Sequence, residues 1–345
     1  MKCLPVNFRW QSANTKREKL KMKILTYLYD ADGSDRKIDL EEDTIGELND
    51  KQLLWVNVLE REEETVKRVV QTLRLDNVPI KGILRITERP KIFKFKDYYH
   101  FFIVSVEMDE ENKLRQIPID FIVGKNFVIT VHEGDVSYLQ DFANRERGEN
   151  NIGELDAESF VGTMLDLHIV SYFRVLEDIE GTVDRMDNRI LKRDLKDEDF
   201  LNQMVKLRSD VSRLRRWFLP HRDIFYQLSR PDFKQIAESD SFENFQALNQ
   251  HFESAVVAIE SARETVLSLF DLFTTKSSHN MNNQVRRLTF VTLIVGGLGA
   301  IAGVWGMNFE VEYFKWAETG FWGTMVGMGL YVLGAILLGK FLRWF

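Results

Sequence analysis

Short apolar runs rich in β-branched and aromatic residues recur through the first part of the chain, separated by polar turns and by a helical stretch. The runs with this strand-like composition are LLWVNVL (53–59), YHFFIVSV (99–106), IPIDFIV (117–123) and NFVITVH (126–132). The segment EETVKRVVQTLRL (63–75) instead places its apolar residues at the three- and four-residue spacing of a helix. The pattern predicts an α/β cytosolic domain over residues 1–155.

From Asp156 onward the strand pattern ceases and long helical periodicity takes over. No glycine or proline occurs between Pro231 and Gly296, so one very long helix is predicted to lead without a break toward the end of the chain. Its apolar residues recur on one packing face: Phe252, Val256, Ile259, Val266, Phe270 and Phe273. We therefore expect a cytosolic helical region over residues 156–287 that includes a long stalk helix.

Two apolar segments, 288–304 and 321–339, contain no charged residue. Each approaches the roughly 20 residues that a helix needs to cross a bilayer. Neither has the polar face that a helix at the surface of a soluble domain would show. We expect two transmembrane helices, in the following order: a first span at 288–307, an external loop at 308–320, a second span at 321–340 and a cytosolic tail at 341–345.

The charges that flank the two spans predict how the chain is oriented. The basic residues next to the spans are Arg286, Arg287, Lys340 and Arg343. The acidic residues of the loop between the spans are Glu310, Glu312 and Glu318. Because positive charge favours the cytosolic side, a multi-pass protein of the cell (inner) membrane is expected, with both termini in the cytosol and an acidic external loop.

Composition excludes several classes of function. The formal net charge of −7 offers no basic footprint for nucleic acid. The chain has one cysteine, Cys3, and six histidines that lack metal-ligand spacing. It also has no glycine-rich phosphate loop and no convincing arrangement of a nucleophile with a base. We therefore expect neither an enzyme nor a resident cofactor.

The first span ends in the motif Gly306-Met307-Asn308. Two helices cannot enclose a water-filled path, so conduction would require several copies around one axis. A ring of Asn308 carboxamides could then hydrogen-bond a hydrated Mg²⁺ without trapping it, and Gly306 would let the backbone turn. The acidic loop would raise the local cation concentration. The alternative is an ordinary helix cap made by glycine and asparagine.

Helical steps of three or four residues along the first span select one candidate pore-lining stripe. Its members are Val285, Leu288, Thr292, Gly296, Gly299 and Gly303. The stripe is apolar in its first half and rich in glycine in its second. Two uses remain open: a wide, hydrated pore, or close contact between helices, because Gly299 and Gly303 also form a small-xxx-small pair.

These features together resemble the CorA family of divalent-cation channels over essentially the whole chain. Beyond the Gly-Met-Asn motif, the matching residues are Arg89-Pro90-Lys91, Leu288-Thr289 and Phe309-Glu310. The resemblance implies a homopentameric funnel whose first spans line the pore. It also implies Mg²⁺ as the commonest transported ion, with Co²⁺ or Ni²⁺ also passed.

The sequence departs from the family at several positions. The family commonly carries methionine and proline where Gly296 and Gly297 stand. Regulatory carboxylates that bind cytosolic Mg²⁺ in the family fall on Gly82 and Ala247, which cannot bind a metal. Nearby acids that could take over that role are Glu243, Glu253 and Asp271. The departures leave room for a ZntB-like zinc transporter, and a non-conducting sensing or structural membrane protein remains a further alternative.

Overall fold

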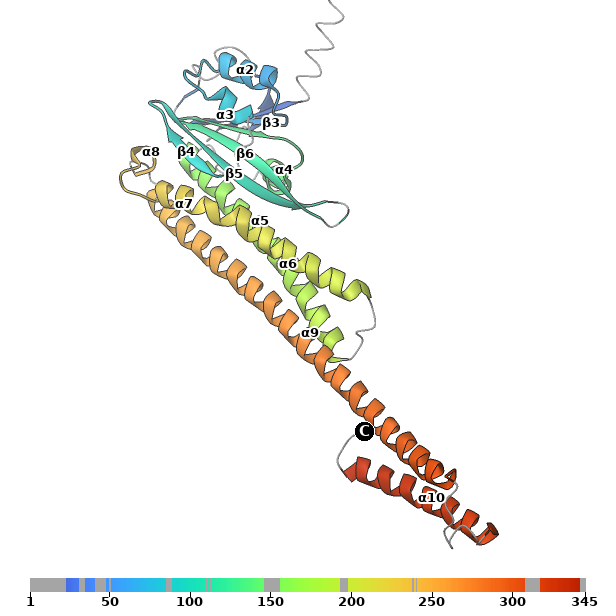
Figure 1. Cartoon of the computed structure of the whole chain (residues 1–345). Coiled ribbons are helices and arrows are strands. Elements are labelled where there is room, and N and C mark those ends of the chain that lie inside the picture. The colour runs from blue at the N-terminus through green and yellow to red at the C-terminus, as the bar shows by residue number, and fades with distance from the viewer. Residues whose placement is uncertain are drawn as a thin grey trace, which may run out of the picture. The chain divides into compact units, whose positions relative to one another are not determined.

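The computed structural model describes most of the chain (Figure 1). The chain forms two compact units. The described residues are 23–30, 35–40, 48–49, 51–84, 89–109, 111, 113–145, 156–192, 198–237, 239, 241–307 and 317–341. The first unit comprises Met1–Met186 and Lys196–Leu267, and the second comprises Asp187–Leu195 and Ser268–Phe345. The long helix named α9 below belongs in part to each unit.

The first unit contains one seven-stranded sheet in the order β2-β1-β3-β7-β6-β5-β4 (Figure 1). Its strands are β1 (Ile24–Asp30), β2 (Arg36–Ile38), β3 (Gln52–Val58), β4 (Lys91–Lys94), β5 (Tyr98–Met108), β6 (Leu114–Gly124) and β7 (Phe127–His132). The β3–β7 pair is parallel, and the other neighbours are antiparallel. All four strands predicted from the sequence are present, and the mixed α/β class is confirmed.

Both faces of the central strands are buried, because successive side chains of a strand point to opposite sides of the sheet. On one face, Leu54 and Val56 of β3 belong to an apolar cluster with Val66 and Val69 of α2 (Glu63–Thr72). The other face carries Trp55, Tyr27, Phe142 and Phe160. The Trp55 ring centroid lies 5.1 Å from that of Tyr27 and 5.7 Å from that of Phe160. Aromatic packing therefore joins the sheet to the helices that follow it.

After β7 the described chain is helical. Its helices are α4 (Ser137–Arg145), α5 (Ala157–Leu191), α6 (Glu198–Phe218), the 3-10 turn η2 (Leu219–His221), α7 (Arg222–Leu228), α8 (Lys234–Ala237), α9 (Phe242–Trp305) and α10 (Ala317–Phe341). The predicted unbroken helix is confirmed: α9 has 64 residues, a length of about 96 Å at 1.5 Å per residue.

The packing face predicted for α9 is buried over most of its length within the first unit. Phe252, Val256, Ile259 and Val266 are buried. Phe270 and Phe273, the last two predicted members of the face, are half-buried and belong to the second unit. The predicted face therefore loses its cover where α9 leaves the first unit.

A buried histidine ties the helical part of the first unit to the sheet. His221 of η2 accepts a hydrogen bond at Nε2 from the Val104 N–H of β5 (2.8 Å) and donates from Nδ1 to the Phe218 carbonyl (2.8 Å). Tyr172 of α5 donates to the Val104 carbonyl (2.7 Å). Burial lowers the pKa of His221 to about 4, so the ring is neutral at pH 7 with its proton on Nδ1.

The lowered pKa of His221 predicts a pH dependence of stability. In the unfolded chain the group has its ordinary value of 6.5, so acid favours unfolding. The contribution of the neutral His221 ring to the free energy of unfolding is fully present above pH 6.5 and is lost as the pH falls toward 4. We expect the His221→Gln variant to lose less unfolding free energy between pH 7 and pH 5 than the natural sequence, by about 2 kcal/mol.

Denaturant titration of both proteins at the two pH values measures this difference. Glutamine can still accept from the Val104 N–H and donate to a carbonyl, so the variant should fold. His132, whose pKa burial also lowers, is present in both proteins and cancels in the comparison. The ring of His168 lies 5.2 Å from that of His221, and burial and then the charge of His221 lower its pKa, so the replacement also relieves His168 and changes the loss in the same direction. Equal losses in the two proteins would contradict the assignment.

Candidate functional site

The second unit contains two helical segments that are long and apolar enough to cross a membrane. One is the last part of α9 and the other is α10. None of the 18 most apolar consecutive residues of either segment is buried inside the chain. Leu288 is 68% exposed, for example, and Leu330 is 63% exposed. Apolar surface of this extent requires lipid or further copies of the chain to cover it.

One close contact joins α9 to α10 within this unit. The Tyr331 hydroxyl of α10 donates a hydrogen bond to the Leu293 carbonyl of α9 (2.9 Å). The Tyr331 ring lies directly against Gly297, because a Cβ atom built there would be 2.1 Å from the hydroxyl oxygen and 2.4 Å from Cζ. Position 297 therefore admits only glycine in this arrangement. The sequence alone did not single out Tyr331, although a tyrosine inside an uncharged apolar run is a usable signal.

The six residues predicted to line a pore lie on a different side of α9 from this contact. Val285 and Leu288 are exposed, and so is Thr292, whose hydroxyl bonds to the Leu288 carbonyl (2.9 Å). No atom lies within 4 Å of a Cβ built at any of the stripe's three glycines, Gly296, Gly299 and Gly303. At 3.6 residues per turn, the stripe is centred about 140° around the helix from Gly297. The stripe is thus open, and α10 does not pack against the three glycines of the stripe.

The end of the first span can be followed as far as Met307. Helix α9 ends at Trp305, and the Gly306 N–H bonds to the carbonyls of Ala302 and Gly303 (both 3.1 Å). Gly306 does not have a positive φ angle, so the expected turn at this residue does not use the left-handed region. Met307 is 50% exposed. Asn308, the residue on which the motif depends, lies outside the described residues.

The predicted loop 308–320 is too long at its end, because α10 already begins at Ala317. One acidic residue of the predicted loop is described, and it lies in this helix. Glu318 is exposed in the first turn of α10, where the helix dipole favours a negative charge. Glu310 and Glu312 lie outside the described residues. Throughout the described ranges, no group of three or more His, Cys, Asp or Glu side chains could hold a metal ion.

Gly82 and Ala247, where the family resemblance implies regulatory carboxylates, are both exposed in the first unit. Gly82 lies on the short helix α3 (Ile80–Leu84), where a Cβ atom would meet Pro79 at an ordinary 3.5 Å. Ala247 lies on α9 one turn after the exposed Glu243. A carboxylate could be introduced at either place without a clash.

The three candidate substitute acids differ in their surroundings. Glu253 accepts two hydrogen bonds from Arg222, each 2.8 Å long, and is therefore already neutralised by an ion pair. Glu243 and Asp271 are exposed on α9. Glu253 is thus the weakest of the three candidates for a cytosolic cation site.

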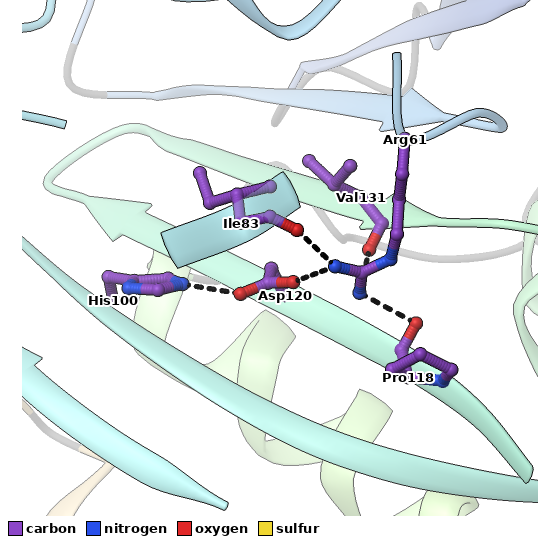
Figure 2. Close-up of polar contacts among 6 residues, drawn as sticks. All are labelled: Arg61, Ile83, His100, Pro118, Asp120 and Val131. Atoms are coloured by element: carbon purple, nitrogen blue, oxygen red, sulfur yellow. Dashed lines mark hydrogen bonds and ion pairs between the residues drawn. The ribbon is translucent and has the colours of Figure 1, made fainter. Parts of the chain in front are cut away.

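A buried ion pair fixes the position of α3 against the sheet (Figure 2). Arg61 Nη1 contacts Asp120 Oδ2 of β6 at 2.6 Å and donates to the Ile83 carbonyl of α3 at 2.5 Å. Arg61 Nη2 donates to the Pro118 carbonyl at 2.8 Å, and His100 Nε2 lies 2.7 Å from Asp120 Oδ1. Arg61 and Asp120 are 4% and 2% exposed. The helix that carries Gly82 is therefore tied directly to the core.

This ion pair was not predicted from the sequence. The carboxylate of Asp120 in the otherwise apolar strand IPIDFIV signals that a buried partner is required. The partner, Arg61, stands 59 positions earlier in the sequence, and no local pattern connects the two.

The fold and the exposed apolar helices define a protein with a mixed α/β and helical part and two candidate membrane helices. Residues 50–340 match the family described as "CorA-like Mg2+ transporter protein". The chain belongs to this family, and it is a CorA-family divalent-cation transporter.

Individual relatives agree with this assignment. The cobalt/magnesium transport protein CorA of Thermotoga maritima is 24% identical over 296 residues, covering 84% of this chain and 83% of that protein. The structure of the CorA magnesium transporter from Methanocaldococcus jannaschii aligns with a TM-score of 0.75 at 19% identity, covering 92% of this chain and 97% of that one. The zinc transport protein ZntB of Photorhabdus laumondii is 19% identical and covers 81% of this chain and 83% of its own length. The relatives therefore include transporters named for different metals.

The buried ion pair predicts a large loss of stability when one charge is removed. Asp120→Asn keeps the shape of the side chain but leaves the Arg61 guanidinium buried without a counter-charge. We expect the unfolding free energy to fall by about 3 to 5 kcal/mol. Asp232→Asn is the matched control, because Asp232 pairs with Arg230 at the surface (2.7 Å) and should lose less than about 1 kcal/mol.

Denaturant titration of the detergent-solubilised protein measures both losses. A similar small loss in the two variants would show that the Arg61–Asp120 pair does not stabilise the sheet domain.

Proposed function

We propose that this protein is a homo-oligomeric channel for Mg²⁺, which also passes Co²⁺ or Ni²⁺. The hydrated ion is recognised by a ring of Asn308 side chains, together with Gly306 and Met307, at the outer end of the first span. The assembly is a homopentamer by the family resemblance, and it conducts ions without covalent chemistry. Both termini lie in the cytosol, because Arg286, Arg287 and Lys340 flank the membrane segments on one side.

The open stripe on α9 carries the proposal. A single chain offers two apolar helices, which cannot surround a path for ions. The side of α9 that bears Gly296, Gly299 and Gly303 has no neighbour within 4 Å of those positions, while Gly297 on another side is occupied by Tyr331. Copies arranged with the open stripes toward a common axis would line a pore with the six predicted residues.

The chemistry along the chain supports a hydrated ion as cargo. Mg²⁺ loses its water reluctantly and is held well by oxygen atoms, whereas Zn²⁺ favours His and Cys ligands in fixed geometry. The described residues contain no such cluster. Glu318, together with Glu310 and Glu312 of the predicted external loop, would concentrate cations at the entrance.

Zinc transport is the second candidate, because a relative of similar length is named a zinc transport protein. The two candidate functions differ in the ion that the site must recognise and pass. Purified protein in liposomes loaded with Mg²⁺- or Zn²⁺-sensitive dyes compares the two fluxes directly. A flux of Zn²⁺ in the absence of any Mg²⁺ flux would overturn the magnesium assignment.

Asn308→Ala tests the recognition step. The change removes the amide oxygens, and even the loss of a helix cap costs only about 0.5 to 2 kcal/mol of stability. We expect divalent-cation flux into liposomes to be lost while the oligomer survives. Mass measurement in detergent checks the assembly, and a stable monomer that still transports would contradict the oligomeric channel.

Asn308→Asp is a second variant, which we expect to bind the ion too tightly rather than too weakly. Several carboxylates around one axis should bind a divalent ion tightly enough to slow its release. Flux should therefore fall although the ion still binds. If Asn308→Ala instead conducts at the natural rate with its oligomer intact, the motif is only a helix cap.

The double variant Gly82→Asp with Ala247→Asp tests regulation. Both positions are exposed and admit the new side chains, and carboxylates there would restore oxygen ligands for cytosolic Mg²⁺. We expect flux to become more sensitive to cytosolic Mg²⁺ than in the natural sequence. The Gly82→Asn, Ala247→Asn protein is the control for side-chain volume without charge.

Liposome flux at a series of internal Mg²⁺ concentrations gives the comparison. If the natural protein already closes sharply at about millimolar Mg²⁺, other ligands are responsible, since sites of this affinity need few charged oxygens.

A further inference from the structure

The first span contains a local weak point at Gly296 and Gly297. Glycine has the lowest helix propensity of any residue except proline, and two in succession make bending easier at that point. The helix α9 nevertheless continues through both residues to Trp305. Backbone hydrogen bonds keep this stretch helical in lipid, but a contact from a neighbouring helix would be needed to oppose bending at the two glycines.

Tyr331 of α10 supplies such an interaction at this point. Its ring covers Gly297 so closely that a Cβ atom there would lie 2.1 Å from the hydroxyl oxygen. Its hydroxyl donates to the Leu293 carbonyl at 2.9 Å. In a regular helix the same carbonyl accepts from the N–H four residues later, which is that of Gly297. The tyrosine thus engages both ends of the helical turn that contains the weak point.

The hydroxyl group is the specific part of this contact. A phenylalanine would fill the same space, but it could not bond to a backbone carbonyl. A tyrosine hydroxyl inside an apolar segment needs a hydrogen-bond partner, since water is scarce there. Another α10 hydroxyl, that of Thr324, bonds instead to the Gly320 carbonyl of its own helix (2.9 Å).

We propose that Tyr331 is a positioning residue that holds the first span straight across Gly296 and Gly297. Through this contact α10 opposes bending of α9, and we call the Tyr331 contact with Gly297 and Leu293 the splint. The consequence for transport rests on the proposed function. The apolar first half of the stripe and its glycine-rich second half stay aligned along one side of α9 only while the helix is straight at Gly296 and Gly297. The glycine pair lets α9 bend when the hydroxyl bond is broken.

Distance measurement between two spin labels tests the inference without relying on transport. Cys3 is the only cysteine, so Cys3→Ser gives a clean background. Arg286→Cys and Val304→Cys place labels at two exposed positions on either side of the weak point. They are 18 residues apart, which is five full turns and about 27 Å along a straight helix. Labelled chains diluted with unlabelled ones keep distances within one chain.

Tyr331→Phe should add a shorter-distance population to the distribution. We expect the bent fraction to rise about threefold, the factor that corresponds to about 0.6 kcal/mol for a hydrogen bond between helices in a membrane. Thr324→Val, which removes a hydroxyl of the same helix, should leave the distribution unchanged. Adding Gly296→Ala to Tyr331→Phe should restore the narrow distribution, because alanine strengthens the helix at a position with free space.

An unchanged distribution in Tyr331→Phe would overturn the inference, as would equal broadening in Thr324→Val. Failure of the alanine rescue would also contradict it, because the bend would then not be at the glycine pair. Flux measured on the same proteins separates the two proposals. The predicted distances in a protein that carries no divalent ions would support the splint and contradict the channel.

Discussion

Helix α9 has to be stable in two different solvents, and the remaining structure follows from this constraint. Its first part has an apolar face that the first unit buries, from Phe245 to Val266. Its last part is apolar and exposed on nearly all sides. An α-helix satisfies its own backbone hydrogen bonds in either environment, so one continuous helix can pass from water into lipid. Only the side chains need to change.

The two ends of α9 therefore use different stabilising interactions. Within the first unit, burial of phenylalanines such as Phe252 supplies the hydrophobic effect, which does not operate between helices in lipid. In the second unit, close contact and one hydrogen bond join α9 to α10 at Gly297 and Tyr331. This contact occupies one side of α9 and leaves the glycine stripe open.

The first unit depends on a few buried polar groups for the placement of its elements. Arg61 joins α3 to β6 through Asp120, and His221 joins η2 to β5. In each case protein groups take the place of water as hydrogen-bond partners, so removing one partner leaves the other unsatisfied. Through Arg61, the helix that carries Gly82 is held to the sheet.

The sequence by itself determined the strands, the unbroken helix and the two apolar segments, because each depends on periodicity or composition within a short stretch. The Gly-Met-Asn motif indicated the family in the same way. Only the tertiary structure decided which glycine packs: Gly297 faces Tyr331, whereas Gly296 is open. It also paired Asp120 with Arg61 and Glu253 with Arg222. Such pairs join residues distant in sequence, and the backbone path that brings them together leaves no local pattern.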